Sequence, residues 1–313
     1  MELRQLKTFQ TVARLLSFNR AAALLNYSRS AVSTQIKLLE EEFGTALFNR
    51  SGKRICLTEA GQMLMSYSQR MLDIEQETLA KVSGLEEPHG SISARVPQSI
   101  STYLLPSVLR KFQADFPKVG FDISTCAYET LIHELKTGIT DIAFLLAESI
   151  PFSELKTEVL GFETLVVVSS PDHPLAKQST VHIHDLAGQS ILLPKHDCSY
   201  KTVFRRILLE EKVERATYIE LNSIEAIKRC VFNGIGVAML PMMAIEDEIA
   251  DKAIVILPWP EEQLETAILM IWHKNKWLSP ILQAFMDTVR QTAHTIACGT
   301  SSLKSAALRP IAG

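Results

Sequence analysis

Two short helical segments joined by a polar turn occupy residues 18–50, and few folds other than a compact helical head accommodate them. In both segments apolar residues recur at the spacing of one helix face. These residues are Ala21, Ala22, Leu24 and Leu25 in the first segment and Val32, Ile36, Leu39 and Phe43 in the second. Ser17 or Asn19 can cap the first helix. Ser28 or Ser30 can cap the second, and Gly44 suits its end. With an amphipathic helix upstream, over residues 3–16, the pattern predicts a three-helix head.

The second helix has a polar side that could meet DNA. Its side chains are of types that hydrogen-bond to base edges and phosphates. They are Arg29, Ser30, Ser33, Thr34, Gln35 and Lys37. Residues 50–57 then predict a short hairpin, or wing, whose basic residues Arg50, Lys53 and Arg54 suit phosphate contact. The alternative is an ordinary three-helix core with a solvated polar face.

Charge is distributed unevenly along the chain. Residues 1–61 hold nine Lys or Arg and five acidic residues, a net charge of +4, whereas the whole chain carries −3. The remaining residues therefore carry −7. A basic head on an acidic body is the distribution expected when one end binds nucleic acid. This asymmetry favours DNA binding over the plain helical core.

Many separate positions of the head match one known family. They are Phe18, Ala21, Ala22, Leu25, Ser28, Ala31, Val32, Ser33, Gln35, Ile36, Leu39, Glu40, Phe43, Gly44, Leu47, Phe48, Arg50, Leu57, Thr58, Ala60 and Gly61. Over this stretch the chain resembles the winged helix-turn-helix domain of LysR-type transcriptional regulators. The resemblance implies a sequence-specific DNA-binding regulator. At Arg29 and Ser30 the chain departs from the Gln and small residue or proline common in the family, so the preferred DNA sequence does not carry over.

Composition places the chain among well-folding globular proteins. Hydrophobic residues make up 47% and charged residues 21% of the 313 residues, which leaves room for one or two further cores. No apolar run approaches the length that spans a bilayer, and no secretory signal pattern follows Met1. The five cysteines include no Cys-x-x-Cys pair, which argues against a disulfide scaffold and a zinc site. We therefore expect a cytoplasmic protein without a cofactor or metal.

Residues 58–87 form one long helical pattern with a narrow apolar stripe. The stripe consists of Leu64, Tyr67, Met71, Ile74 and Thr78. A long helix with such a stripe needs a partner helix, which predicts a homodimer through residues 59–87. The alternative is packing on its own domain. In LysR-type proteins this segment resembles the linker helix that pairs two subunits, and residues 86–90 then predict a hinge.

From residue 91 short apolar runs alternate with helical patterns. The runs predict strands at 92–96, 121–127, 142–146, 164–169, 191–193, 217–221, 236–240, 254–257 and 266–272, and the other patterns predict helices at 102–115, 129–137, 201–212, 223–233 and 242–249. This alternation predicts parallel sheets with crossover helices. The fold resembles the two-lobed α/β effector domain of LysR-type regulators, which is similar to periplasmic solute-binding proteins. Residues 137–143 and 233–241 resemble markers of the family.

The predicted organisation has four parts. Residues 1–58 form the winged helix-turn-helix domain, and residues 59–90 form the linker helix and hinge. Residues 91–290 form the effector-binding domain, with lobe I at about 91–163 and 268–290 and lobe II at about 164–267. Crossings between the lobes are expected near 161–165 and 264–268. Residues 291–313, small and polar, predict a weakly ordered tail.

Open α/β sheets bind ligands at the carboxyl ends of their strands, where helix N-termini converge. The residues predicted at such positions are Ser99, Ser101, Thr102, Tyr128, Thr130, Cys198, Ser199, Asn222 and Ser223. Several are hydroxyls ahead of a helix, so a small carboxylate or other anion could bind there as effector. For each residue alone the alternative is helix capping.

Two other groups suggest different chemistry. Cys198 is predicted at a helix start, where the helix dipole favours the thiolate, and it falls where a peroxide-sensing branch of the family has its reactive cysteine. The helix that follows contains no second cysteine, so a plain thiol lining the effector site is favoured over redox sensing. His182 and His184 could share a strand face as metal ligands, but a solvated connection is favoured. No catalytic motif stands out, so we expect no enzyme.

Two functions therefore compete. One is a transcription factor whose DNA binding or bending responds to a small molecule, and the other is a solute-binding or enzymatic α/β protein with an incidental helical cap. The basic head favours the first. The family resemblance further implies activation of a divergent neighbour, self-repression and a homotetramer of paired dimers, with RNA polymerase as a further partner. The effector and the regulated genes stay open.

Overall fold

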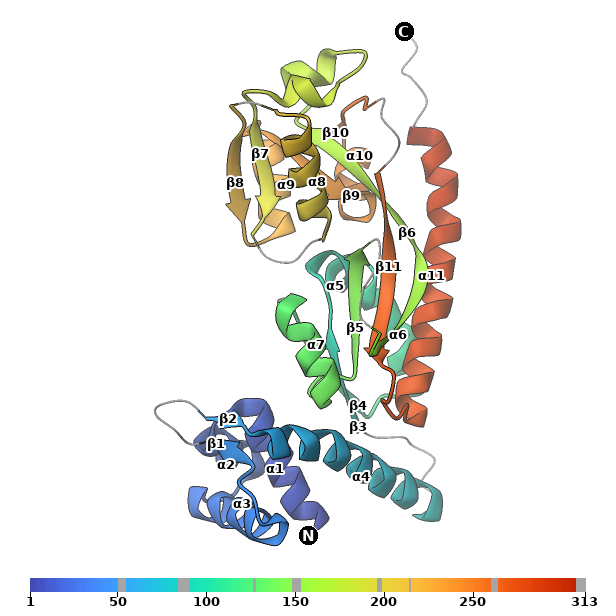
Figure 1. The fold of residues 1–313 in the computed structure, drawn as a ribbon. Coiled ribbons are helices and arrows are strands. Elements are labelled where there is room, and N and C mark those ends of the chain that lie inside the picture. Colours follow the sequence, from blue (N-terminus) through green and yellow to red (C-terminus); the bar gives the residue numbers. More distant parts are fainter. Residues whose placement is uncertain are drawn as a thin grey trace.

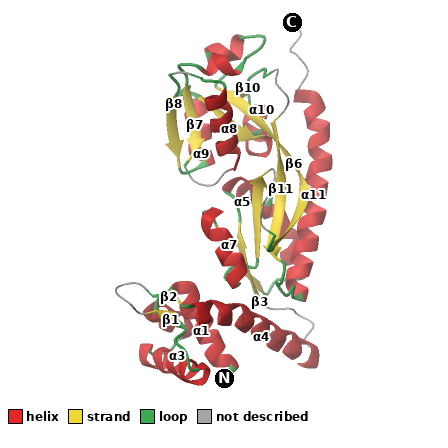
Figure 2. Ribbon diagram, in the orientation of Figure 1, coloured by secondary structure: helices red, strands yellow, loops and turns green. Residues whose placement is uncertain are grey.

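The computed structural model describes residues 1–49, 55–83, 90–125, 128–147, 153–195, 199–213, 215–259 and 264–307. A helical head lies at one end beside the long helix α4, and the two lobes of an α/β domain follow one above the other (Figure 1). Strands run through the middle of both lobes, with helices on their outer faces (Figure 2). The architecture is therefore the predicted head, linker helix and two-lobed domain.

Three helices form the head: α1 (Leu3–Leu15), α2 (Phe18–Leu25) and α3 (Arg29–Phe43). Of the predicted capping residues, Ser17 caps α2 and Ser28 caps α3 through their hydroxyls. The head core is apolar and fully buried, and it includes Leu6, Phe9, Val12, Ala21, Val32, Ile36 and Leu39. Two residues of the predicted apolar faces, Leu24 and Phe43, are exposed instead, because each lies in the last turn of its helix, away from the buried stripe.

The wing and α4 complete the head. Strands β1 (Phe48–Asn49) and β2 (Cys56–Leu57) pair antiparallel, as the predicted wing requires, and α4 (Glu59–Ser83) begins directly after them. At Gly61 a Cβ would lie 2.1 Å from the carbonyl oxygen of Leu47, so only glycine allows α4 to start against the head. Farther along, α4 exposes the apolar side chains of Met63, Tyr67, Met71, Ile74, Leu79 and Val82. Residues 84–89, which hold most of the predicted hinge, lie outside the described residues.

Nine strands of the described residues form one sheet, in the order β4-β3-β5-β11-β6-β9-β7-β8, with β10 paired to β6. They are β3 (Gly90–Arg95), β4 (Val119–Ser124), β5 (Ile142–Ala147), β6 (Leu155–Ser169), β7 (Ser190–Pro194), β8 (Thr217–Leu221), β9 (Val237–Pro241), β10 (Val255–Ile256) and β11 (Leu264–His273). Strands β3, β4 and β5 are parallel, as are β7, β8 and β9. Strands β6 and β11 run antiparallel to each other and to β9 and β5. The prediction of parallel sheets is therefore correct at both ends of the sheet and wrong at its centre.

Strands β6 and β11 belong to both lobes. β6 pairs with β11 from Leu155 to Leu165 and with β9 from Leu165 to Val168, and the register with β11 shifts between Ile268 and Leu269. The partner of β6 therefore changes from β11 to β9 at Leu165. β6 begins earlier than the predicted residue 164, because its first half alternates exposed with half-buried residues and so lacks an apolar run.

Helices cover both faces of each lobe. They are α5 (Gln98–Tyr103), α6 (Leu105–Asp115), α7 (Tyr128–Thr137), α8 (Ser199–Glu210), α9 (Ile224–Phe232), α10 (Glu246–Ala250) and α11 (Pro280–Ala307), with 3-10 turns η1 (Pro174–Lys177), η2 (Ile183–Leu186) and η3 (Met242–Ala244). In lobe I, α6 and α11 pack on one face and α7 on the other, and in lobe II α8 and α9 pack on opposite faces. The predicted helix 102–115 is two helices, because Pro106 in the first turn of α6 has no N–H to continue α5.

Residues 291–307 are helical, in place of the predicted weakly ordered tail. Helix α11 continues to Ala307, and Val289, Thr292 and Ala293 extend its buried face past the point where the sequence pattern weakens. Residues 308–313 lie outside the described residues. Among the helices that the structure describes, none combines the length and the apolar character needed to cross a bilayer.

Candidate functional site

Helix α3 presents most of its predicted DNA-contacting residues to the surface. Arg29, Ser30, Thr34 and Lys37 are exposed, whereas Ser33 and Gln35 are half-buried. The Gln35 Oε1 atom accepts a hydrogen bond of 2.6 Å from the hydroxyl of Thr8 on α1, which is fully buried. The bond to Thr8 therefore holds the Gln35 side chain against α1. The side-chain amide of Gln35 can still donate hydrogen bonds, so the residue could both position α3 and contact DNA.

The wing is anchored to α3 by a carboxylate that the sequence analysis did not single out for this role. The Glu40 Oε1 atom accepts hydrogen bonds from the N–H groups of Leu47 and Phe48, at 2.9 and 3.3 Å. The ring of Phe48 packs on Phe9 with centroids 5.4 Å apart. Strand β1 thus begins at a set position relative to α3. The predicted tip residues Arg50, Lys53 and Arg54 lie outside the described residues.

In lobe I the predicted effector residues differ in their surroundings. Ser99 in the first turn of α5 is fully buried, and its hydroxyl has no hydrogen-bond partner among the described residues. The Ser101 hydroxyl donates to the carbonyl of Gln98 at 3.1 Å, and Thr102 is exposed. Thr130 is exposed on α7. Helix α7 begins at Tyr128, whose side chain lies outside the described part.

In lobe II the predicted residues follow β7 and β8, whose carboxyl ends adjoin because Pro194 pairs with Leu221. Ser223 caps α9 by accepting from the N–H of Ala226 at 3.4 Å, so the capping alternative holds for this residue. Asn222 is exposed. Cys198 and the side chain of Ser199 lie outside the described residues. Asn222 and Ser223 therefore follow the carboxyl end of β8, beside that of β7.

A polar group that sequence reasoning missed joins α5 of lobe I to α9 of lobe II. We call Gln98, Tyr103, Glu225, Lys228 and Glu248 the interlobe cluster. Oε1 of Gln98 accepts from the N–H of Ile224 at 3.0 Å, and the hydroxyl of Tyr103 donates to Glu225. Nζ of Lys228 lies 2.9 Å from the Tyr103 hydroxyl, 2.9 Å from Glu225 and 2.7 Å from Glu248. No local pattern could reveal this cluster, because its members in lobe I lie more than a hundred residues before its members in lobe II.

Ionisation in the interlobe cluster follows from its burial and hydrogen bonds. Burial, helped by the hydrogen bond to Glu225, raises the pKa of Tyr103 to about 12, so its hydroxyl stays protonated and donates at neutral pH. Although burial works against the ammonium, hydrogen bonds to Glu248, Tyr103 and Glu225 raise the pKa of Lys228. The cluster therefore keeps one charge pattern through the neutral range.

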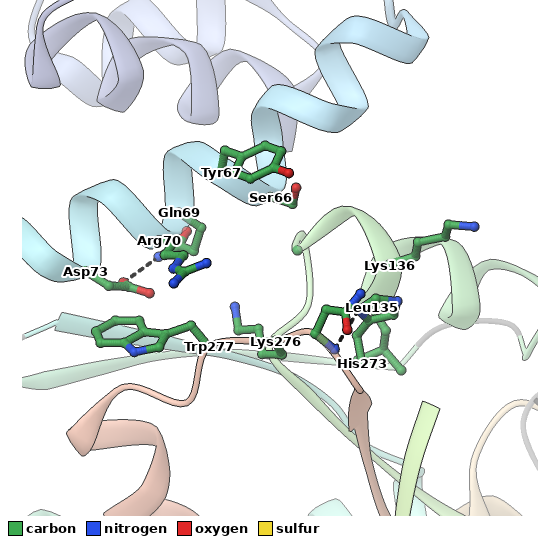
Figure 3. Close-up of a pocket in the computed structure, with 12 residues that line it drawn as sticks. Ser66, Tyr67, Gln69, Arg70, Asp73, Leu135, Lys136, His273, Lys276 and Trp277 are labelled. Atoms are coloured by element: carbon green, nitrogen blue, oxygen red, sulfur yellow. Dashed lines mark hydrogen bonds between the residues drawn. The ribbon is translucent and has the colours of Figure 1, made fainter. Parts of the chain in front are cut away.

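A hollow of about 240 Å³ lies away from the predicted effector residues, between α4 and lobe I (Figure 3). Gln69, Arg70 and Asp73 line it from α4, and Lys276 and Trp277 line it from the segment that follows β11. Within the ranges that the structure describes, no three His, Cys, Asp or Glu side chains gather as metal ligands would. His182 and His184 lie at η2, where the N–H of His182 donates to Asp185 at 2.8 Å.

Two family models match the chain. "Bacterial regulatory helix-turn-helix protein, lysR family" matches residues 3–62, and "LysR substrate binding domain" matches residues 85–294. The chain is 36% identical over 293 residues to the uncharacterized HTH-type transcriptional regulator YwqM of Bacillus subtilis, across 93% of this chain and 99% of that protein.

Solved structures share the fold. A full-length OxyR variant from Pseudomonas aeruginosa has a TM-score of 0.70 at 22% identity, covering 94% of this chain and 95% of that one. Full-length LysG from Corynebacterium glutamicum with bound effector Arg has a TM-score of 0.66 at 21% identity, covering 94% and 99%. At these identities the likeness concerns the arrangement of head, linker helix and lobes.

Proposed function

We propose how this chain, which belongs to the LysR family of transcriptional regulators, recognises its DNA and its effector. The family makes it a DNA-binding transcriptional regulator with an effector-binding domain. Our proposal is that α3 and the wing bind operator DNA, and that a small carboxylate or other anion between the lobes alters that contact. The exposed polar side of α3, on a head of net charge +4, carries the proposal.

Within the DNA contact, the residues have two roles. Arg29, Ser33 and Thr34 lie along the first turns of α3 and have the donors and acceptors that read base edges in a major groove. Lys53 and Arg54, in the wing, supply cations for phosphates and so contribute affinity at any sequence. Ser30, Gln35, Lys37 and Arg50 complete the contact surface.

For the effector, the hydroxyl of Ser99 supports an anionic ligand. A buried hydroxyl without a partner costs free energy, and a ligand carboxylate would remove that cost by accepting its hydrogen. Amide groups at the starts of α7, α8 and α9 would add donors, at positions where the other predicted residues lie: Ser101, Thr102, Tyr128, Thr130, Cys198, Ser199, Asn222 and Ser223. The related LysG structure contains the effector Arg, which has a carboxylate.

For assembly, the exposed apolar residues of α4 support pairing of two linker helices. A row of such side chains on one helix stabilises the protein when a second helix covers it. Two paired heads would meet two half-sites on DNA. We extend the proposal to a homotetramer of such dimers in the cytoplasm, with RNA polymerase as the partner that reads the regulated complex.

The test measures DNA binding by full-length variants. A preferred duplex is first selected from a random library, and fluorescence anisotropy then gives affinities for this duplex and for unrelated DNA across salt concentrations. Arg29→Ala should cost about 1–3 kcal/mol on the preferred duplex and relax sequence preference. Lys53→Ala should weaken binding to all duplexes and reduce the salt slope by about 1.

Lys111→Ala is the matched control, because Lys111 is an exposed lysine on α6, outside the head. It should leave both affinities unchanged. The assignment fails if Arg29→Ala and Lys53→Ala change sequence preference equally, or if Lys111→Ala weakens binding as much as either of them.

A further inference from the structure

The turn between α7 and β5 brings lobe I against the head of the same chain. Gly138 has φ +73°, and a Cβ on it would lie 3.5 Å from the Cα atom of Ser66 on α4. The next residue, Ile139, is half-buried and packs against the apolar core of the head. This turn, which lies inside the motif at residues 137–143, therefore brings lobe I against α4 and the head core, and α7 also lies against α4.

Two residues farther on, Asp141 ties this turn to β3 and to the segment after β11. Its Oδ2 atom accepts from the N–H and the hydroxyl of Ser93, both at 2.7 Å, and its other oxygen pairs with Lys276. Both partners of that ion pair are almost fully buried. Although burial works against the carboxylate, Lys276 and Ser93 hold the pKa of Asp141 below its ordinary value.

On the other side of the hollow, α4 presents a second carboxylate. Asp73 accepts from the amide of Gln69 at 2.8 Å, and Gln69 in turn accepts from Arg14 of α1 at 3.0 Å. Lys276 and Asp73 point into the same hollow from opposite walls (Figure 3). Lys276 thus pairs with Asp141 of lobe I and lines the same hollow as Asp73 of the linker helix.

We propose that residues 138–141 dock the linker helix α4 onto lobe I of its own subunit, with Ile139 as the apolar contact and the buried Asp141–Lys276 pair fixing the turn beside the hollow that Asp73 lines. The docking couples lobe I to the DNA-binding head. The coupling of lobe I to the head rests on the proposed function, whereas the docking itself does not.

The contact has the features of a reversible one. A hollow lies between residues 66–73 of α4 and lobe I, so the two parts do not form one continuous core there. The contact is also connected to the predicted effector site. Ser93 on β3 donates a hydrogen bond to Asp141, and β3 leads directly into α5, which carries Ser99. A ligand that moves α5 would therefore act on Asp141 and through it on Lys276.

Docking should strengthen as pH falls. Burial raises the pKa of Asp73, so the docked state binds a proton more tightly than a state with α4 released and Asp73 solvated. Acidification through the range between the ordinary and the raised pKa therefore favours docking. The charged and titratable groups around Asp73 and the hollow are Arg14, Arg70, Lys136, Asp141, His273 and Lys276.

Trp277 supplies the readout, since it lines the same hollow as Asp73 (Figure 3). Acrylamide quenching of tryptophan fluorescence is measured on the full-length protein and on Ile139→Thr, and again in a Trp277→Phe background that isolates the Trp277 contribution. Ile139→Thr should raise the quenching of Trp277. Val159→Thr is the control, because Val159 is an exposed β-branched residue of lobe I that does not line the hollow, and it should change nothing.

Two further comparisons complete the test. The quenching of Trp277 should fall in the wild type as the pH is lowered through the range between the raised and the ordinary pKa of Asp73, and Asp73→Asn, which leaves the Lys276–Asp141 pair intact, should remove this dependence. Equal quenching of Ile139→Thr, Val159→Thr and wild type would overturn the docking.

Coupling is tested by DNA affinity. Ile139→Thr should change the affinity of the full-length protein for its preferred duplex, and Val159→Thr should not. Raised quenching with unchanged affinity would overturn the coupling. The fluorescence measurement needs neither DNA nor effector, so a failure of the proposed function would be seen separately, as a wild type without sequence preference.

Discussion

Two buried serines of lobe I differ in whether their hydroxyl groups have hydrogen-bond partners. Ser93 on β3 donates to Asp141 and accepts from its N–H at 3.0 Å, so its hydroxyl is fully used. Ser99 on α5 is equally buried, and its hydroxyl finds no partner among the described residues. The same side chain therefore stabilises the fold at one position and costs free energy at the other, which is the pattern expected where a ligand binds.

Ser99→Ala should leave the free energy of unfolding unchanged or raise it, because it removes an unsatisfied hydroxyl, whereas Ser93→Ala should lower it by about 1–3 kcal/mol. Urea unfolding of the full-length variants measures both. In thermal unfolding against a panel of small carboxylates, a ligand at a hundredfold its dissociation constant adds about 2.7 kcal/mol to the wild type, and Ser99→Ala should lose that gain. Equal destabilisation by the two substitutions would show that Ser99 is an ordinary structural residue.

For single residues, the sequence predicts which side chains are exposed better than it predicts their hydrogen-bond partners. The polar side of α3 could be predicted from helical spacing, since exposure follows from which face is apolar. The bond between Gln35 and Thr8 could not, because it depends on how α1 crosses α3. The same holds for Glu40, whose two backbone partners belong to the wing.

Among the elements, α5 and α9 carry the direct polar contact between the lobes. Tyr103 on α5 meets Glu225 and Lys228 of α9, and the ammonium of Lys228 also lies 5.2 Å from the centre of the Tyr103 ring. Removal of the hydroxyl leaves Lys228 paired with two carboxylates, so the fold of lobe II should survive. The contact between the lobes would weaken.

Tyr103→Phe should lower the free energy of unfolding by about 1.5–3 kcal/mol, the range for hydrogen bonds to charged groups. Tyr218→Phe is the matched control: Tyr218 lies on β8 of lobe II, where Arg205 stacks over its ring and remains there after the change. It should cost less than about 0.5 kcal/mol. Urea unfolding at neutral pH compares them, and a similar loss for both would mean that the Tyr103 hydroxyl does not hold the lobes together.

Strands and helices with a clear apolar period could be predicted, and their pairing could not. Strand β8 was predicted with its observed bounds because its residues favour strands and turns flank it. The antiparallel centre of the sheet was missed, because the pairing of β6 with β11 joins segments about a hundred residues apart and leaves no local signal. Residues 291–294 show the converse, since Thr292 and Ala293 are buried although the sequence pattern there is weak.

For the whole molecule, the exposed apolar residues of α4 indicate an incomplete surface. Val82 is 82% exposed and Ile74 48% exposed, although both are large apolar residues on one helix. Such a row on a helix is typical of a face that a second copy covers. The order of head, linker and lobes could be predicted from sequence, but the contact of α4 with lobe I could not, since it depends on how α7 and the turn at residues 138–141 come to lie against α4.

Ile74→Glu should shift the protein from dimer toward monomer, because it places a charge in the proposed contact between two α4 helices. Sedimentation velocity over a range of concentrations measures the shift. Leu24→Glu removes an even more exposed apolar residue from the head, 68% exposed on α2, and should leave the oligomeric state unchanged. A dimer that survives Ile74→Glu with unchanged strength would place the subunit contact elsewhere.

The two strands shared by the lobes also decide which motion is mechanically easy. β6 and β11 form a narrow antiparallel ribbon with a register shift near its middle, and this two-stranded ribbon joins the lobes. Such a ribbon twists readily, whereas pulling it apart breaks its hydrogen bonds one after another. Rotation of lobe II about this ribbon is therefore the motion that we expect to need the least free energy when a ligand binds. Because β11 ends at His273, just ahead of Lys276, such a rotation would act where lobe I meets the linker helix.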